Sequence, residues 1–335
     1  MNAAAAVVLV VGLAWGRDFF APILMAAVIV VIAFPVRALV RRKTGSRWVA
    51  TAALMAVAYA ILLGIAALIF AAAAQFVRLL PQFSAALDSA SVAVVEFSRA
   101  MGLTRRGAES AGDWLQPEVM LAAAESLVAY LVSQATALAL VVVYIFFLSV
   151  DSARFNDIRA HFAEVRRSQL DTLVGLTAAV RRYFAVSSVF GAIVATLDTV
   201  LLLILNVPGA LVWGILAFVT NFIPNIGFVL GLIPAVTFAF LSGGWVTALI
   251  VFTTYCLINV VLQTFIQPRF VGEAVRLSQT LAFGSVIFWT IVIGPPGAIL
   301  AVPLTLTARA SLIRRGSRSA EWWSWITGDR RDTAR

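Results

Sequence analysis

Four polar side chains stand four residues apart in an otherwise apolar part of the chain. The stretch 245–267 carries Tyr255, Asn259, Gln263 and Gln267 among Val, Leu, Ile and Phe. A helix brings residues i and i+4 onto the same face, so these four side chains form one polar stripe. Amides in an apolar medium need partners, and the stripe either joins two helices or faces a cavity that binds a solute. Four polar groups in register favour the cavity.

Asp198 is the only charged side chain between Arg182 and Arg269. A carboxylate inside an apolar segment is expected to coordinate an ion or carry a proton. The alternative is that Asp198 lies near a membrane interface or beside a helix N-terminus, where it would only be solvated or capped. It has no second aspartate nearby, so the carboxylate pair of an intramembrane aspartic protease is absent.

The segment TNFIPNIGFVLGLIPAV (220–236) is uncharged, yet it is rich in residues that interrupt helices or need hydrogen-bond partners. These residues are Asn221, Asn225, Pro224, Pro234, Gly227 and Gly231. Irregular backbone at membrane depth is tolerated where it is buried in protein or lines a wet cavity, and interrupted apolar segments mark transporter sites. The segment predicts a broken or re-entrant hairpin that offers amides to a solute. A proline-kinked helix that packs through small residues is the other interpretation.

The composition defines the setting in which these groups must act. The 335 residues are 62% hydrophobic and 12% charged, whereas soluble domains are about half apolar and a quarter charged. We therefore predict an all-α polytopic membrane protein in contact with the lipid bilayer. The net charge of +9 falls in clusters between apolar runs. This pattern is typical of loops at an anionic leaflet and argues against nucleic-acid binding.

Enzymatic chemistry is not predicted. One cysteine, Cys256, and one histidine, His161, are too few for a zinc site or an intrachain disulfide. The HExxH, GxSxG, Walker A and GxGxxG patterns do not occur. We expect no metal, no cofactor and no catalytic residue.

The apolar runs give about eight helical segments, some broken or re-entrant, with amphipathic helices on both sides of the membrane. Basic clusters such as RALVRRKTGSR (37–47) are expected in the cytoplasm by the positive-inside rule, together with both termini. The predicted divisions are membrane helices in 1–76, an extracytoplasmic amphipathic segment in 77–126, a membrane helix in 127–150, a cytoplasmic amphipathic segment in 151–182, a transport core with interrupted helices in 183–312 and a basic cytoplasmic tail in 313–335.

The extracytoplasmic segment contains a narrow apolar seam at spacings of three and four. Its residues are Leu80, Phe83, Leu87, Ala90, Val94, Phe97 and Met101. Such a seam covers the protein itself or the membrane surface, or it joins subunits. A homo-oligomer through 80–101 follows from the last of these.

Three blocks in the C-terminal half resemble the autoinducer-2 exporter family of bacterial permeases. They are NFIPNIGFVLGLIPA (221–235), IQPRFVGEAVRLS (266–278) and GPPGAILAVPLT (294–305), and FPVRALVRR (34–42) is similar to the family's N-terminal element. The matching positions are Pro224, Gly227, Gly231, Pro234, Pro268, Gly272, Gly294, Gly297 and Pro303. The resemblance implies an inner-membrane permease that exports small organic molecules such as autoinducer-2, and some relatives resemble sodium- or lithium-proton antiporters. Many members carry a Glu where this chain has Leu262 and Gln263, a departure that argues against cation-proton antiport unless Asp198 replaces that Glu.

The predicted function is export of a small, neutral, polar solute by a transporter of the quorum-sensing type. The solute would bind among Asp198, the amides of Asn221 and Asn225, and the stripe. The first alternative is a sodium- or lithium-proton antiporter that uses Asp198 to exchange H+ for Na+. The second is an oligomeric membrane scaffold without transport.

Overall fold

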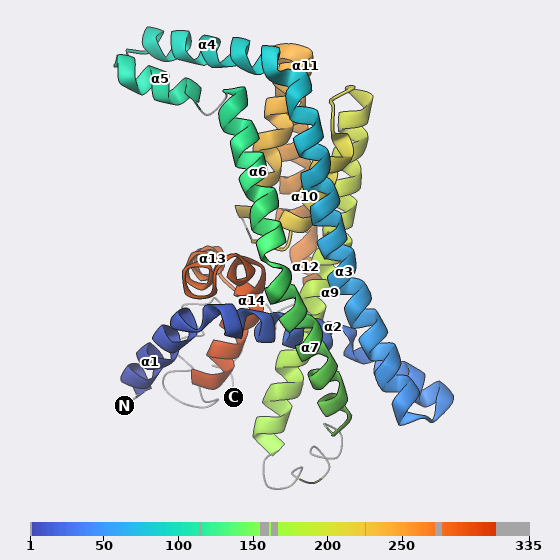
Figure 1. Cartoon of the computed structure of the whole chain (residues 1–335). Coiled ribbons are helices and arrows are strands. Elements are labelled where there is room, and N and C mark those ends of the chain that lie inside the picture. Colours follow the sequence, from blue (N-terminus) through green and yellow to red (C-terminus); the bar gives the residue numbers. More distant parts are fainter. Residues whose placement is uncertain are drawn as a thin grey trace.

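The computed structural model describes residues 2–102, 104–113, 116–154, 161, 167–224, 226–271 and 277–312. The predicted positions Asn225 and Gly272, the tail 313–335 and most of 155–166 lie outside these ranges. Within them all regular structure is helical, which confirms the all-α polytopic fold (Figure 1). Five helices are long and apolar enough to cross a membrane.

The helices are α1 (Asn2–Trp15), α2 (Arg17–Thr44), α3 (Arg47–Leu79), η1 (Leu80–Phe83), α4 (Ser84–Ala100), α5 (Arg105–Asp113), α6 (Pro117–Ser133), α7 (Ala135–Asp151), η2 (Ser152–Arg154), α9 (Arg167–Ile204), α10 (Ala210–Thr220), α11 (Ile226–Asn259), η3 (Val260–Ile266), α12 (Gln267–Val271), α13 (Gln279–Ile293) and α14 (Pro295–Leu312).

Local sequence signals set several of the helix ends. Gly45 ends α2 with a φ of 68°, a left-handed conformation that a residue with a Cβ adopts at a cost. The Ser46 side chain then accepts a hydrogen bond from the Val49 backbone N–H and caps α3. Pro117 begins α6, where its missing N–H removes no helical hydrogen bond. The membrane helix expected to begin at 127 is thus part of a longer α6–α7 pair that starts at Pro117.

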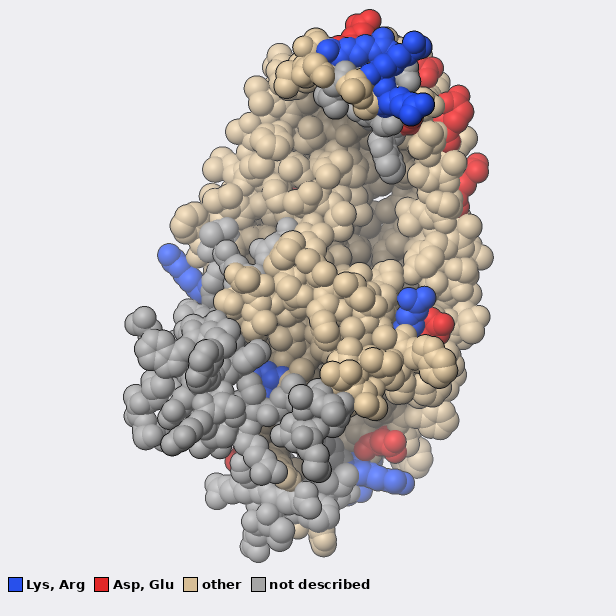
Figure 2. Space-filling model, turned by 90° about the vertical axis from the view of Figure 1, so that its left-hand side faces the viewer, with Lys and Arg blue, Asp and Glu red and all other residues tan. Residues whose placement is uncertain are grey.

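The amphipathic helices α4 and α5 lie across one end of the bundle, at the C-terminal end of α3 (Figure 1). Charged side chains gather at this end and are sparse over the apolar middle of the face in Figure 2. The first part of the predicted seam covers the protein itself, because the Phe83 and Phe238 rings lie 5.2 Å apart and Leu80 is buried. Phe97 and Met101 are exposed. A subunit contact through this helix stays a prediction.

The helices α9, α10 and the first part of α11 run side by side. Helix α10 has 11 residues and is about 16 Å long, roughly half the 30 Å of a hydrocarbon core. The turn before α10 packs beside the C-terminal end of α3, because a Cβ on Gly209 would lie 2.7 Å from Leu79. The chain then reverses between Thr220 and Ile226. The predicted re-entrant hairpin is therefore present as α10 and the start of α11, with its turn inside the bundle.

Helix α11 is two helices joined at a kink. Gly244 has a φ of 71° and a ψ of −168°, which no helix contains and which favours glycine. The first part, 226–243, rises from the re-entrant turn, and the second part, 245–259, returns along it. Pro234 lies within the first part without interrupting it.

The last two helices form a second tight hairpin. Gly294 turns the chain with a φ of 77°, and the Trp289 indole N–H donates to the Thr305 hydroxyl at 3.0 Å. This hairpin shares a buried cluster with α9 and with Phe222 of the re-entrant turn. The first hairpin's turn is thus held by the second hairpin. Pro303 lies inside α14 and does not break it.

Gly297 lets the two helices of this second hairpin approach each other, and its replacement is the first test of the fold. A Cβ at Gly297 would collide with the Trp289 carbonyl oxygen, so we expect Gly297→Ala to destabilise the purified protein by about 1–3 kcal/mol. Gly284→Ala is the matched control, because nothing lies within 4 Å of a Cβ built there. The measurement is the thermal unfolding midpoint in detergent. Equal midpoints for the two variants would contradict the packing described here.

Candidate functional site

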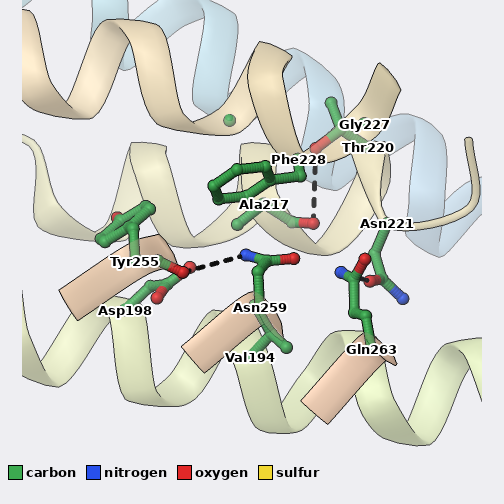
Figure 3. A pocket seen from close by; sticks show the side chains of 11 residues that line it. Val194, Asp198, Ala217, Thr220, Asn221, Gly227, Phe228, Tyr255, Asn259 and Gln263 are labelled. Carbon is green, nitrogen blue, oxygen red and sulfur yellow. Dashed lines mark hydrogen bonds between the residues drawn. The ribbon is translucent and has the colours of Figure 1, made fainter. Parts of the chain in front are cut away.

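A pocket lies between α9, the α10–α11 hairpin and the returning part of α11. Its lining residues are Val194, Asp198, Ala217, Thr220, Asn221, Gly227, Phe228, Gly231, Tyr255, Asn259 and Gln263. Its empty volume, counted out to the open solvent at its mouth, is about 240 Å³. Five of the seven side chains predicted to bind a solute or an ion meet here, although they come from three segments of the chain (Figure 3).

Asp198 supplies the only charge among the described lining residues. It is 1% exposed, so it does not lie at a solvated interface. Its Oδ1 atom has no hydrogen-bond partner. Burial of an acceptor without a donor is costly in an apolar bundle, so a donor that reached the pocket would stabilise this carboxyl group.

The polar stripe enters the pocket over three of its four positions. Tyr255 and Asn259 are buried, and Gln263 is half-buried. Gln267 is not among the lining residues. From Val260 to Ile266 the helix is a π-helix, whose wider turn breaks the spacing of four that would have kept Gln267 in line. π-Helical turns recur at functional sites, and sequence spacing alone could not reveal this one.

Two amides close one end of the pocket. The Gln263 Nε2 donates to the Asn221 Oδ1 at 2.8 Å, and the Asn221 Nδ2 donates to the Ser187 carbonyl at 2.9 Å. Asn221 fits against α9 because Gly191 has no side chain: a Cβ there would lie 2.9 Å from the Asn221 Nδ2. These bonds link the re-entrant turn to α9 and to the returning helix.

The predicted glycines act through close packing. A Cβ on Gly227 would collide with the Thr220 carbonyl, which fixes how tightly the chain reverses. Gly231 lines the pocket beside Ala217. Pro224 lies in the turn itself and accepts a hydrogen bond from the Ile226 N–H at 2.7 Å. Pro268 falls within the short helix α12.

Several residues of the site were not predicted. Thr220 and Phe228 line the pocket, and the Tyr183 hydroxyl donates to the Phe222 carbonyl at 3.1 Å. A helical count back from Asp198 would have found the α9 members, because they occupy one face. That face contains Asp198, Val194, Gly191, Ser187 and Tyr183.

The pocket offers groups that can hydrogen-bond a polar ligand. The described lining residues supply hydroxyls, amides and one carboxyl group, and none of them is histidine, cysteine or lysine. Over the described ranges no cluster of three His, Cys, Asp or Glu side chains could hold a metal ion.

A bundle of membrane-crossing helices with a polar pocket at an interrupted hairpin is the architecture of a membrane permease. The chain belongs to the AI-2E transporter family, because the model described as AI-2E family transporter matches residues 4–314. The chain is 26% identical over 309 residues to the AI-2 transport protein TqsA of Escherichia coli (strain K12), covering 91% of this chain and 89% of TqsA. It is 23% identical to a protein of Haemophilus influenzae named provisionally as a transport protein, covering 99% and 96% of the two chains.

The contact between Gly191 and Asn221 gives a test of the site's geometry. We expect Gly191→Ala to destabilise the protein by about 1–3 kcal/mol, because the new methyl group displaces the Asn221 amide. In an Asn221→Ala background the same change should cost much less, since the side chain it displaces is gone. Gly175→Ala on the same helix, with nothing within 4 Å of its Cβ, is the control. Additive unfolding midpoints across the four variants of the cycle would show that the two residues do not interact.

Proposed function

We propose that the protein exports a small polar organic solute that binds in the pocket beneath the re-entrant turn. The observation that carries this proposal is the gathering of Asp198, Asn221, Tyr255, Asn259 and Gln263 in one pocket of an otherwise apolar bundle. A membrane helix bundle gains nothing from such groups unless they pair with each other or with a ligand. Autoinducer-2 is the first solute to test, because the relative TqsA is named for its transport.

The polar and the apolar residues of the pocket would contact different parts of the solute. Amides and hydroxyls can hydrogen-bond a polyhydroxylated solute, while Phe228 and Val194 contact its carbon atoms. The enclosed space in the pocket is only about 10 Å³, room for about one water molecule, far below the 300–1,000 Å³ of most ligand pockets. Entry of a solute therefore requires the α10–α11 hairpin to move relative to α9.

The location that fits this function is the bacterial inner membrane. The basic cluster 37–47 lies at the α2–α3 turn, at the opposite end of α3 from α4 and α5 (Figure 1). The positive-inside rule puts that turn in the cytoplasm, together with both termini. The helices α4 and α5 then lie on the outer side, where an exported solute leaves.

Export of autoinducer-2 is tested in cells that lack their own exporter. We expect the protein to increase release, and the double variant Asn259→Ala/Gln263→Ala to lower that increase by about tenfold or more, because two hydrogen-bonding groups are lost. Gln267→Ala is the matched control, since Gln267 belongs to the same stripe in sequence but does not line the pocket. Autoinducer-2 in the medium is measured against the amount of protein in the membrane. Release that does not depend on the protein would rule out autoinducer-2 as its substrate. Equal loss of release in the double variant and in Gln267→Ala would rule out the pocket as the binding site.

Ion coupling is a second candidate, favoured by the buried carboxyl group of Asp198 within the same pocket. In inverted membrane vesicles, sodium- or lithium-driven proton movement should be abolished by Asp198→Asn, which keeps the shape and removes the ionisable group. Asp18→Asn, at a carboxylate whose side chain is 99% exposed, should leave it unchanged. A protonophore should also stop solute release if a proton gradient drives export. Proton movement that survives Asp198→Asn excludes coupling through this residue.

A further inference from the structure

One end of the pocket presents oxygens that have no partner. Four buried side-chain oxygens lack a hydrogen bond within the described ranges, and three of them belong to lining residues of this pocket. They are the Asp198 Oδ1, the Tyr255 hydroxyl and the Asn259 Oδ1. In Figure 3 Asp198 and Tyr255 lie together at one end of the pocket, and Asn259 lies between them and the Asn221–Gln263 pair, with its amide nitrogen turned toward Tyr255 and its oxygen toward Gln263. We call the three oxygens the oxygen cluster.

The amide donors of the pocket are already engaged within the protein. The Asn259 Nδ2 donates to the Tyr255 carbonyl at 3.4 Å (Figure 3), the Gln263 Nε2 donates to Asn221, and the Asn221 Nδ2 donates to Ser187. The Thr220 hydroxyl donates to the Leu216 carbonyl at 2.8 Å. Each of these amides has a second N–H, and the Tyr255 hydroxyl is a further donor. Among the described residues, however, none donates to the Asp198 Oδ1. A ligand that donates to this carboxyl group would supply the missing hydrogen bond.

The charge of the oxygen cluster points the same way. Asp198 carries its only carboxyl group, and no lysine, arginine or histidine is among the described lining residues. A buried carboxylate is stabilised by a positive partner with N–H groups. The cluster supplies three oxygens, whereas Ca²⁺ requires six to eight, and the described chain has no group of acidic, His or Cys side chains for a divalent ion.

We propose that the oxygen cluster binds the primary ammonium group of a small organic amine. A primary ammonium has three N–H donors, no acceptor and one positive charge, so it can donate to the unpartnered Asp198 Oδ1 and Tyr255 hydroxyl and balance the charge of the carboxylate. The Tyr255 and Phe228 rings give the carbon chain apolar and cation-attracting faces. The inference rests on the proposed function, since it names the chemical class of solute that the transport pocket takes.

The first experiment measures binding of methylammonium to the purified full-length protein in detergent, by equilibrium dialysis of the labelled ion and by thermal shift. Three matched probes separate the contributions: tetramethylammonium has the charge but no N–H, sodium is an inorganic cation, and ethylene glycol is neutral. We expect methylammonium to bind and to raise the unfolding midpoint, and the other three to do so at least about tenfold more weakly. Equal binding of tetramethylammonium or sodium overturns the proposal in favour of a general cation site. Absence of methylammonium binding overturns it outright.

Variants then locate the site. Asp198→Asn should weaken methylammonium binding by about tenfold or more because the charge is lost, and Tyr255→Phe should weaken it less because one oxygen is lost. Asp18→Asn should bind as the unchanged protein does. Each variant is first checked for a cooperative unfolding transition, so that Tyr255→Phe still tests the site if Asp198→Asn does not fold. Binding that persists unchanged in both folded variants overturns the assignment.

The outcomes distinguish this inference from the proposed function. If release of autoinducer-2 depends on Asn259 and Gln263 but methylammonium does not bind, the proposed export function stands and the ammonium site is ruled out. If methylammonium binding depends on Asp198 but autoinducer-2 is not released, the ammonium site stands and autoinducer-2 is ruled out as the exported solute.

Discussion

A chain that reverses inside a membrane must find partners for backbone groups that a continuous helix would have satisfied. In this protein the reversal falls between Thr220 and Ile226, where water is not freely available. The Ile223 N–H donates to the Thr220 carbonyl at 2.8 Å, and the Gly227 N–H donates to the Ile223 carbonyl at 3.0 Å. The Phe222 carbonyl accepts from the Tyr183 hydroxyl. The positions of the groups in the pocket depend on these hydrogen bonds, because they fix the turn around which the pocket is built.

Helix α9 supports the turn through one of its faces. Along that face lie the Tyr183 hydroxyl donor, the Ser187 carbonyl acceptor, Gly191, which leaves room for Asn221, and the Asp198 carboxyl group. Close approach is essential, because a Cβ on Gly214 would collide with the Thr199 hydroxyl and lie 3.3 Å from the Ala195 carbonyl. The turn is also held from its other side by Trp289 and Ile293 of the second hairpin, which share a buried cluster with Phe222. Movement of one hairpin would therefore disturb the packing of the other.

The unpartnered oxygens of the pocket lower the stability of the folded bundle. An unpartnered buried polar group costs about 1–3 kcal/mol, so the oxygen cluster is an expense that the apolar packing around it must offset. The aromatic contacts among Phe76, Trp213 and Phe238, with ring centroids 4.9–6.0 Å apart, join the two hairpin helices α10 and α11 to α3. They stabilise the limbs of the hairpin while its turn stays polar. A ligand with the right donors would recover part of the cost, which is how binding energy can be coupled to movement.

The sequence by itself determined the class of protein, its helical content and the presence of a re-entrant hairpin. Long uncharged runs can bury their backbone only as helices, and the prolines, glycines and asparagines of 220–236 are hard to place in an uninterrupted one. It also singled out Asp198 and the stripe of Tyr255, Asn259 and Gln263, since polar groups are conspicuous against an apolar background. Only the tertiary structure decided which of these meet. A π-helical turn removes Gln267 from the stripe, and Gly191 and Ser187 hold Asn221 from another helix. Helical periodicity reports the direction of a side chain within one helix, whereas the depth, rotation and partner of that helix are set by packing between segments far apart in the chain.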